Sequence, residues 1–159
     1  MTNALKTYLN DHLAGSAHAI SLTEFIRDRN LGTSLGQFAS DLLREITEDR
    51  NVLMEIAKSV GAAPSTVKQA VGWIGEKATR IKLGAASSRE FGTMEALELL
   101  ELGIHGKWAM WRALASLADS DSRLRGRDYD ALLRRAERQR DSVESQRLQI
   151  ALMSLRPAA

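Results

Sequence analysis

Apolar residues recur every three or four positions along most of the 159-residue chain, rather than alternating with polar ones. This spacing predicts helices and not strands. The chain has only two prolines, Pro64 and Pro157, so long segments run without a helix breaker. We therefore expect four long helices and one shorter accessory helix, over residues 3–30, 34–60, 90–118 and 127–155 and over residues 65–83.

The links between these helices predict how they are arranged. Few residues separate the first helix from the second and the third from the fourth, so each pair should form an antiparallel helical hairpin. The stretch between the second and third helices is longer and contains the accessory helix. The sequence thus predicts an all-α fold in a single domain over residues 1–159, with two hairpins joined by a long crossover.

Polar residues on the apolar faces of the long helices point to a candidate site. The buried faces of packed helices are normally apolar, so polar residues there need an explanation. On the register assigned here, such residues fall at a similar depth in all four long helices. They are Ser16, Glu45, Glu48, Asp49, Glu101 and Arg140, with His12 one turn before Ser16.

Carboxylates at mid-depth in a four-helix bundle are typical of di-iron sites. Such a site takes a Glu from each of two helices and a Glu-x-x-His pair from each of the other two. The chain contains no Glu-x-x-His, and the second helix reads EITED over residues 45–49. A standard di-iron ligand set is therefore not expected.

Three segments resemble a ferritin-like family of small bacterial stress-response proteins: YLND at 8–11, LREITE at 43–48 and WRALA at 111–115. The resemblance implies a ferritin-like four-helix bundle in which most di-iron ligands have been replaced. Ser16 then stands where the family has a glutamate, and Glu48 stands where it has a histidine. Ile104 and Arg140 take the places of two further acids, while Glu45 and Glu101 are kept.

The arginine at position 140 has a physical consequence. A guanidinium beside a metal site repels a dication, and it can instead balance Glu101 and either Glu45 or Glu48 in an internal ion network. Two alternatives stay open at this point. Arg140 can turn to solvent with Glu45, Glu48 and Asp49 on a solvated flank. Alternatively, a residual iron or manganese site can form from Glu101, His105, His12 and Glu45.

Composition excludes several classes of chemistry. The chain has no cysteine, which excludes disulfides, thiolate zinc sites and iron–sulfur clusters. It has no glycine-flanked serine turn and no phosphate-binding loop, so no catalytic residue is identified. No stretch approaches the roughly 20 apolar residues that cross a bilayer. We expect a cytoplasmic protein that is not bound to a membrane and has no resident cofactor. A role other than that of an enzyme is favoured.

The charged residues are unevenly distributed along the chain. The formal net charge is only +2, but the stretch from Ser122 onward has nine arginines against five acids. An exposed arginine stripe would bind nucleic acid, whereas the interleaved acids favour a solvated, paired helix face.

The leading hypothesis is a non-enzymatic ferritin-like protein acting in stress adaptation or protein interaction, with no identified partner protein. Apolar residues of the crossover, Val67, Val71, Trp73 and Ile74, suggest that it forms a homodimer. The alternatives are a cryptic iron or manganese protein and a nucleic-acid or regulatory binding module that uses the last helix.

Overall fold

A computed structural model describes residues 3–62, 73–82, 84 and 88–156. This part of the chain is helical and contains no strand. Its elements are α1 (Asn3–Arg29), α2 (Ser34–Ser59), α3 (Trp73–Lys82), α4 (Arg89–Leu117), the short 3-10 helix η1 (Ser122–Leu124) and α5 (Tyr129–Ser154). The predicted all-α class is confirmed. The four long helices begin and end within two residues of their predicted bounds.

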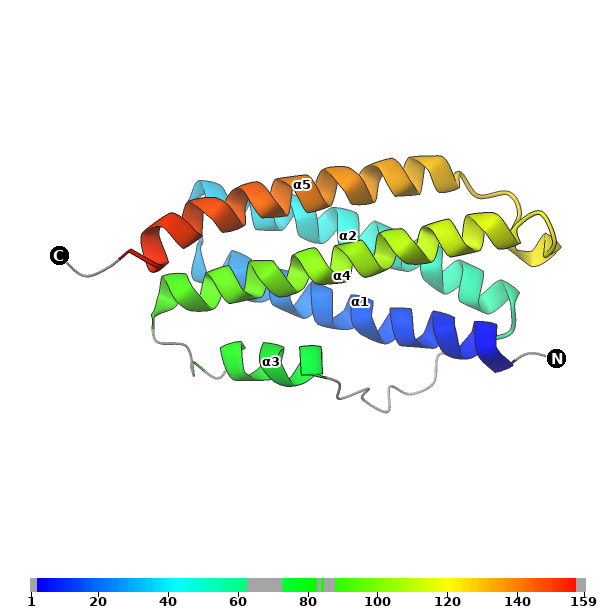
Figure 1. The fold of residues 1–159 in the computed structure, drawn as a ribbon, viewed down its shortest axis with the longest axis horizontal. Coiled ribbons are helices and arrows are strands. Elements are labelled where there is room, and N and C mark those ends of the chain that lie inside the picture. Colours follow the sequence, from blue (N-terminus) through cyan, green and yellow to red (C-terminus); the bar gives the residue numbers. More distant parts are fainter. Residues whose placement is uncertain (1–2, 63–72, 83, 85–87, 157–159) are drawn as a thin grey trace.

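The four long helices pack side by side, with α3 against the outer side of α1 and α4 (Figure 1). The most extensive contacts join α1 to α2 and α4 to α5, so each pair is a hairpin. The hairpins meet where α1 contacts α4 and where α2 contacts α5. The predicted helix order is therefore present. The first residues of the predicted accessory helix lie outside the described part, as do Val67 and Val71 and the side chains of Trp73 and Ile74.

The turn between α1 and α2 needs glycine at two positions. Gly32 has a positive φ of 76°, which side chains other than glycine's rarely adopt. Thr33 caps α2, and its side-chain oxygen accepts a hydrogen bond from the Gly36 backbone N–H at 3.1 Å. A Cβ on Gly36 would lie only 2.1 Å from the Asn30 carbonyl oxygen. The close approach of the two helices therefore depends on Gly36.

The α4–α5 connection is held by buried and capping hydrogen bonds. The Tyr129 hydroxyl donates to the Leu124 carbonyl oxygen at 2.8 Å in the interior. Ser59, at the end of α2, donates to the Arg123 carbonyl oxygen at 3.0 Å. The first bond joins η1 to α5 of its own hairpin, and the second joins η1 to the end of α2 in the other hairpin.

The α2 core face follows the sequence, whereas the α5 core face does so only in part. The sequence repeats apolar residues every three or four positions along α2 and into its C-cap, with Asp49 in the same row, and all seven residues of this row are buried: Ala39, Leu42, Ile46, Asp49, Leu53, Ile56 and Val60. In α5 the buried residues are Tyr129, Leu132, Ala136, Gln139 and Val143. The row that repeats every three or four residues from Leu133 is buried at Ala136 and Val143 and only half-buried at Leu133, Arg140, Arg147 and Ile150. One residue is about 100° around a helix, so Gln139 and not Arg140 faces the interior.

None of the helices in the described part is both long and apolar enough to cross a membrane. The long helices instead carry charged residues on their outer faces and apolar residues between them, as expected of helices that pack on one another.

Candidate functional site

An ion network crosses the interior from α4 to α2 and α5. Asp49 of α2 is only 2% exposed, and its Oδ2 lies 2.5 Å from the Nζ of Lys107 on α4. The other carboxylate oxygen of Asp49 pairs with the guanidinium of Arg135 on α5. A buried carboxylate therefore has a cation on each oxygen, which is how a buried charge is tolerated.

Gln139 completes the network from α5. Its side chain is 3% exposed, and its Oε1 accepts a hydrogen bond from Lys107. Its Nε2 donates to Glu45 Oε2 at 2.9 Å and to Asp49 Oδ2 at 3.3 Å. Because both ends of the amide have partners of the right kind, its orientation is determined by the network.

The network reaches the surface through Arg135 and Glu48. Arg135 Nη1 lies 3.0 Å from Glu48 Oε2, and the Glu48 side chain is 54% exposed. In the interior, burial lowers the pKa of the Lys107 ammonium, and the neighbouring Asp49 carboxylate opposes that shift. The inner pair of charges is thus largely removed from water, whereas the outer pair is solvated.

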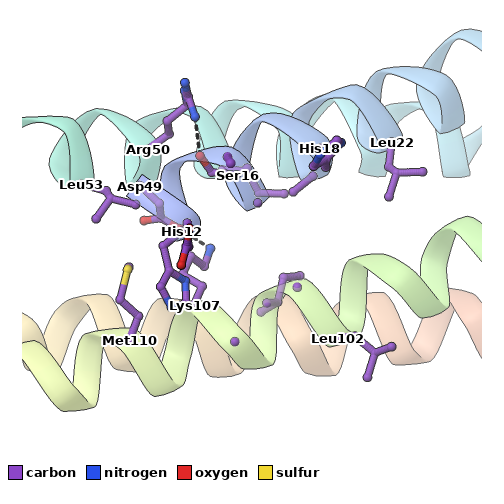
Figure 2. Close-up of a pocket in the computed structure, with 18 of the residues that line it drawn as sticks. His12, Ser16, His18, Leu22, Asp49, Arg50, Leu53, Leu102, Lys107 and Met110 are labelled. Carbon is purple, nitrogen blue, oxygen red and sulfur yellow. Dashed lines mark hydrogen bonds and ion pairs between the residues drawn. The ribbon is translucent and has the colours of Figure 1, made fainter. Parts of the chain in front are cut away.

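Beside this network lies a cavity of about 610 Å³ between α1, α2 and α4. Its walls are mostly apolar, and they include Leu22, Leu53, Leu99, Ile104 and Met110. Figure 2 shows Leu53 of α2 and Met110 of α4 projecting into the space between their helices. The cavity thus lies along the seam where the first hairpin meets the second.

Small residues on two helices account for the empty space. Gly15 on α1 and Gly103 and Gly106 on α4 line the cavity. A Cβ added at any of the three would meet no atom within 4 Å outside its own backbone surroundings. Ala14 and Ala19 extend this row along α1. Larger residues at these positions would close the space, so the cavity follows from residue size.

Polar groups gather in the middle of the cavity. Lys107 and Asp49 of the network line it, and Figure 2 shows His12 of α1 beside them. Burial lowers the pKa of His12, and the weaker influence of Asp11 raises it. The His12 ring also meets the Tyr8 ring edge-on, with centroids 4.6 Å apart. An uncharged imidazole therefore faces the same space as the buried ion pair.

Arg50 lies at the α1–α2 side of the cavity. Its Nη1 donates to the Leu13 carbonyl oxygen and to Ser16 Oγ, both at 2.5 Å. Figure 2 shows its guanidinium directed toward α1 and Ser16, away from Lys107. The hydroxyl of Ser16 itself donates to the Leu13 carbonyl oxygen at 2.7 Å. Ser16, which was expected where the family has a metal-binding glutamate, thus accepts a hydrogen bond from Arg50 instead.

The structure brings together only some of the residues that the sequence indicated. Glu45, Glu48 and Asp49 all belong to the ion network, but its cations are Lys107 and Arg135. Arg140 does not reach it, because the α5 register turns its side chain outward to Asp141, 3.1 Å away. The predicted pairing of Arg140 with the acids of the second helix is therefore corrected, whereas its charge does act on Glu101 and opposes the rise in the pKa of that carboxyl.

Glu101 belongs to a separate surface group. Its nearest cation is Arg147, at 3.8 Å, and Arg147 also lies 2.6 Å from Glu144. Partial burial raises the pKa of Glu101, and Glu144 adds to the rise. Glu98 of α4, 3.4 Å from Arg147, is a third acid of this group, which joins α4 to α5. Glu101 therefore stands apart from Glu45 and Asp49.

The four residues considered for a residual metal site do not gather. His105 is exposed and stacks on Trp108, with ring centroids 5.7 Å apart. His12 packs on Tyr8, and Glu45 accepts its hydrogen bond from Gln139. Within the described ranges, no three side chains of His, Asp or Glu are arranged to hold a metal ion. The donor set in this region does not fit iron or manganese.

Sequence reasoning missed Lys107, Arg135 and Gln139, although two of them lie in rows with helical spacing. Lys107 occupies the buried row Leu100, Ile104, Lys107, Trp111 and Leu114, and Gln139 occupies the α5 row described above. Both rows step alternately by three and four residues, as a packed helix face does. Rows through Trp108 and through Arg140 have the same spacing, so the spacing is compatible with Lys107 and Gln139 inside but does not single them out.

Comparisons with known proteins identify no relative of this chain. No family model, no curated protein and no solved structure matches the chain. The ferritin-like resemblance therefore rests on the three sequence segments, and the function has to be derived from the geometry of the ion network and the cavity.

Proposed function

We propose that this protein is a non-catalytic, ferritin-like four-helix bundle that binds a small apolar molecule in the cavity between α1, α2 and α4. The observation that carries the proposal is the cavity itself. Its volume of about 610 Å³ lies within the roughly 300–1,000 Å³ of small-molecule sites, and its walls are mainly apolar. A few polar groups, Lys107, Asp49 and His12, lie at one place in it, which is the usual composition of such a site.

The ion network supports a binding role over metal chemistry. Lys107 and Arg135 bring two positive charges to the carboxylates of α2, where a metal-binding relative would place cations. A divalent ion beside a buried ammonium and a guanidinium is repelled by both. It also supports a non-catalytic role, because the buried acid and base are engaged with each other and with Gln139. The family resemblance extends the proposal to stress adaptation in the cytoplasm.

The test is the binding of a neutral apolar probe. N-phenyl-1-naphthylamine, which fluoresces in apolar surroundings, is titrated into the parent and into two variants. Gly106→Leu places a side chain at a cavity-lining position with free space around it. Ala109→Leu adds the same side chain to the exposed face of α4, away from the cavity.

We expect the parent and Ala109→Leu to bind the probe alike, and Gly106→Leu to bind about tenfold more weakly or not at all. Circular dichroism checks that all three remain helical. Absence of probe binding by the parent, or equal binding by Gly106→Leu, would contradict the proposed function.

A further inference from the structure

On the basis of the proposed binding function, we propose that the molecule bound in the cavity carries an uncharged oxygen acceptor, as in a ketone, ester or alcohol, which accepts a hydrogen bond from Lys107. The ligand class is thus an apolar molecule with one neutral polar end. The inference follows from the count of donors and from the charges that surround Lys107.

Lys107 has one more N–H donor than it has acceptors. An ammonium group carries three donors and no acceptor. Two of its donors go to Asp49 Oδ2 and Gln139 Oε1, and no third acceptor is present among the described residues. The Lys107 side chain is 15% exposed and lines the cavity. Its third N–H can therefore donate a hydrogen bond to a molecule that occupies the cavity.

A second donor beside the cavity also lacks an acceptor. Trp111 lines the cavity and is fully buried, and its indole Nε1 has no hydrogen-bond partner in the described part of the chain. The indole N–H can only donate. The Asp49 Oδ1 atom, an acceptor of the cavity lining, also has no hydrogen-bond partner in the described part, but its charge is paired with the Arg135 guanidinium. The groups of Lys107 and Trp111 that remain are donors, so the cavity favours a ligand that accepts hydrogen bonds.

The charges around Lys107 favour an uncharged acceptor. The network contains three carboxylates, those of Glu45, Glu48 and Asp49, and only two cations, Lys107 and Arg135. It has no surplus positive charge for an anionic ligand. A carboxylate would add an uncompensated charge to a region of low dielectric, which is costly.

The remaining groups in the cavity are consistent with a neutral ligand. Arg50 uses Nη1 for Leu13 and Ser16 and points away from Lys107, so it does not supply the missing positive charge (Figure 2). An amine ligand would place a second cation beside the Lys107 ammonium. The uncharged His12 ring can donate or accept, and it tolerates a hydroxyl as well as a carbonyl.

The test is a competition on the full chain at neutral pH. N-phenyl-1-naphthylamine is displaced with 2-decanone, decanoate and decylamine, which have chains of the same length and differ in the polar end. We expect 2-decanone to displace the probe at a concentration about tenfold below that of either charged compound. If decanoate or decylamine competes as well as 2-decanone, the neutral-acceptor inference is wrong although the cavity still binds. If the probe itself does not bind, the proposed binding function fails and the inference with it.

A spectroscopic measurement tests the hydrogen bond directly. The infrared carbonyl stretch of isotope-labelled 2-decanone should move to lower wavenumber on binding, because a hydrogen bond from an ammonium group weakens the C=O bond. Lys107→Met should abolish this shift, and Lys58→Met, on the exposed face of α2, should leave it unchanged. If Lys107→Met does not fold, the parent spectrum decides, because an unshifted carbonyl in the bound state overturns the inference.

Discussion

The interior of this protein contains two regions that differ in how they fill the space between helices. Where α2, α4 and α5 converge, long polar side chains meet and satisfy one another, with Lys107, Asp49 and Gln139 at the centre. Where α1 faces α4, glycine and alanine leave a cavity. The same helix, α4, serves both regions with residues only one position apart, Gly106 and Lys107.

The comparison indicates that the size of the residues between the packed helices contributes to which region is filled. The first region is tightly coupled, so removal of one member should be costly. The second region contains unfilled space, so a larger side chain there should be tolerated or should stabilise the folded protein. The following predictions, from the largest expected effect to the smallest, test that contrast.

The largest effect is expected when one member of the ion network is removed. Asp49→Ala leaves Lys107 and Arg135 without their shared buried carboxylate, and the loss should be about 3–5 kcal/mol in the free energy of unfolding. Urea denaturation measures it. Glu48→Ala is the matched control, because its carboxylate is 54% exposed and its loss should be about 1 kcal/mol or less. A small effect of Asp49→Ala would show that the network is solvated.

Replacement of the four innermost members of the network together should behave differently from the loss of one member. A variant with Asp49→Leu, Lys107→Met, Arg135→Met and Gln139→Leu buries apolar groups of similar size and no charge. Such exchanges are often neutral or stabilise a protein by about 1–4 kcal/mol. We expect this variant to unfold at a urea concentration at or above that of the parent. A loss as large as that of Asp49→Ala would show that the network contributes net stability.

In the open region, addition of a methyl group should stabilise the protein. Gly106→Ala meets free space and replaces a poor helix former with the best one, so a gain of about 1 kcal/mol is expected. Gly36→Ala is the opposing control, because its Cβ would press on the Asn30 carbonyl, and it should lose about 1–3 kcal/mol. Thermal unfolding of both variants measures the difference. If both changes destabilise the protein, the space around Gly106 is not free.

The smallest effect is a dependence of stability on pH that comes from His12. Its pKa in the folded protein is lowered from 6.5 by burial, so below pH 6.5 the unfolded chain binds the proton more readily. The free energy of unfolding should therefore fall as the pH is lowered through this range, down to the folded pKa. Above pH 6.5 the contribution is complete. Denaturation between about pH 8 and about pH 5 measures the effect.

The control for this dependence is a pair of variants. His12→Gln should remove the dependence that His12 causes, whereas His105→Gln, at an exposed position, should keep it. An unchanged pH profile in His12→Gln would show that another group is responsible.

The sequence predicted the helices well because their apolar spacing is local information. It predicted the α2 face fully, since Leu42, Ile46, Leu53 and Ile56 leave only one consistent register. In α5 the prediction holds for Ala136 and Val143. It fails at the middle of the helix, where Gln139 and not Arg140 is buried, because arginines and small residues surround a sparse apolar row and two registers fit it.

The candidate site was only partly predictable for a different reason. Glu45, Glu48 and Asp49 were identified from their depth in one helix, but their partners lie about 60 to 90 residues away, as shown by Lys107 and Gln139. Local patterns do not specify which distant side chains meet. The cavity was not predicted because empty space depends on the packing of α1 on α4, and the helical glycines that create it carry no distinctive spacing.

The position of the cavity between the two hairpins has a consequence for the rate at which a molecule enters. Each hairpin is held together by its own extensive contacts, while the cavity lies on the seam between them. Gly15 of α1 and Leu102 and Gly103 of α4, which line the cavity, are exposed, so the cavity opens to solvent along this seam. A small molecule can therefore enter between α1 and α4 with every helix intact, and we expect its rate of entry to be set by the side chains at this opening.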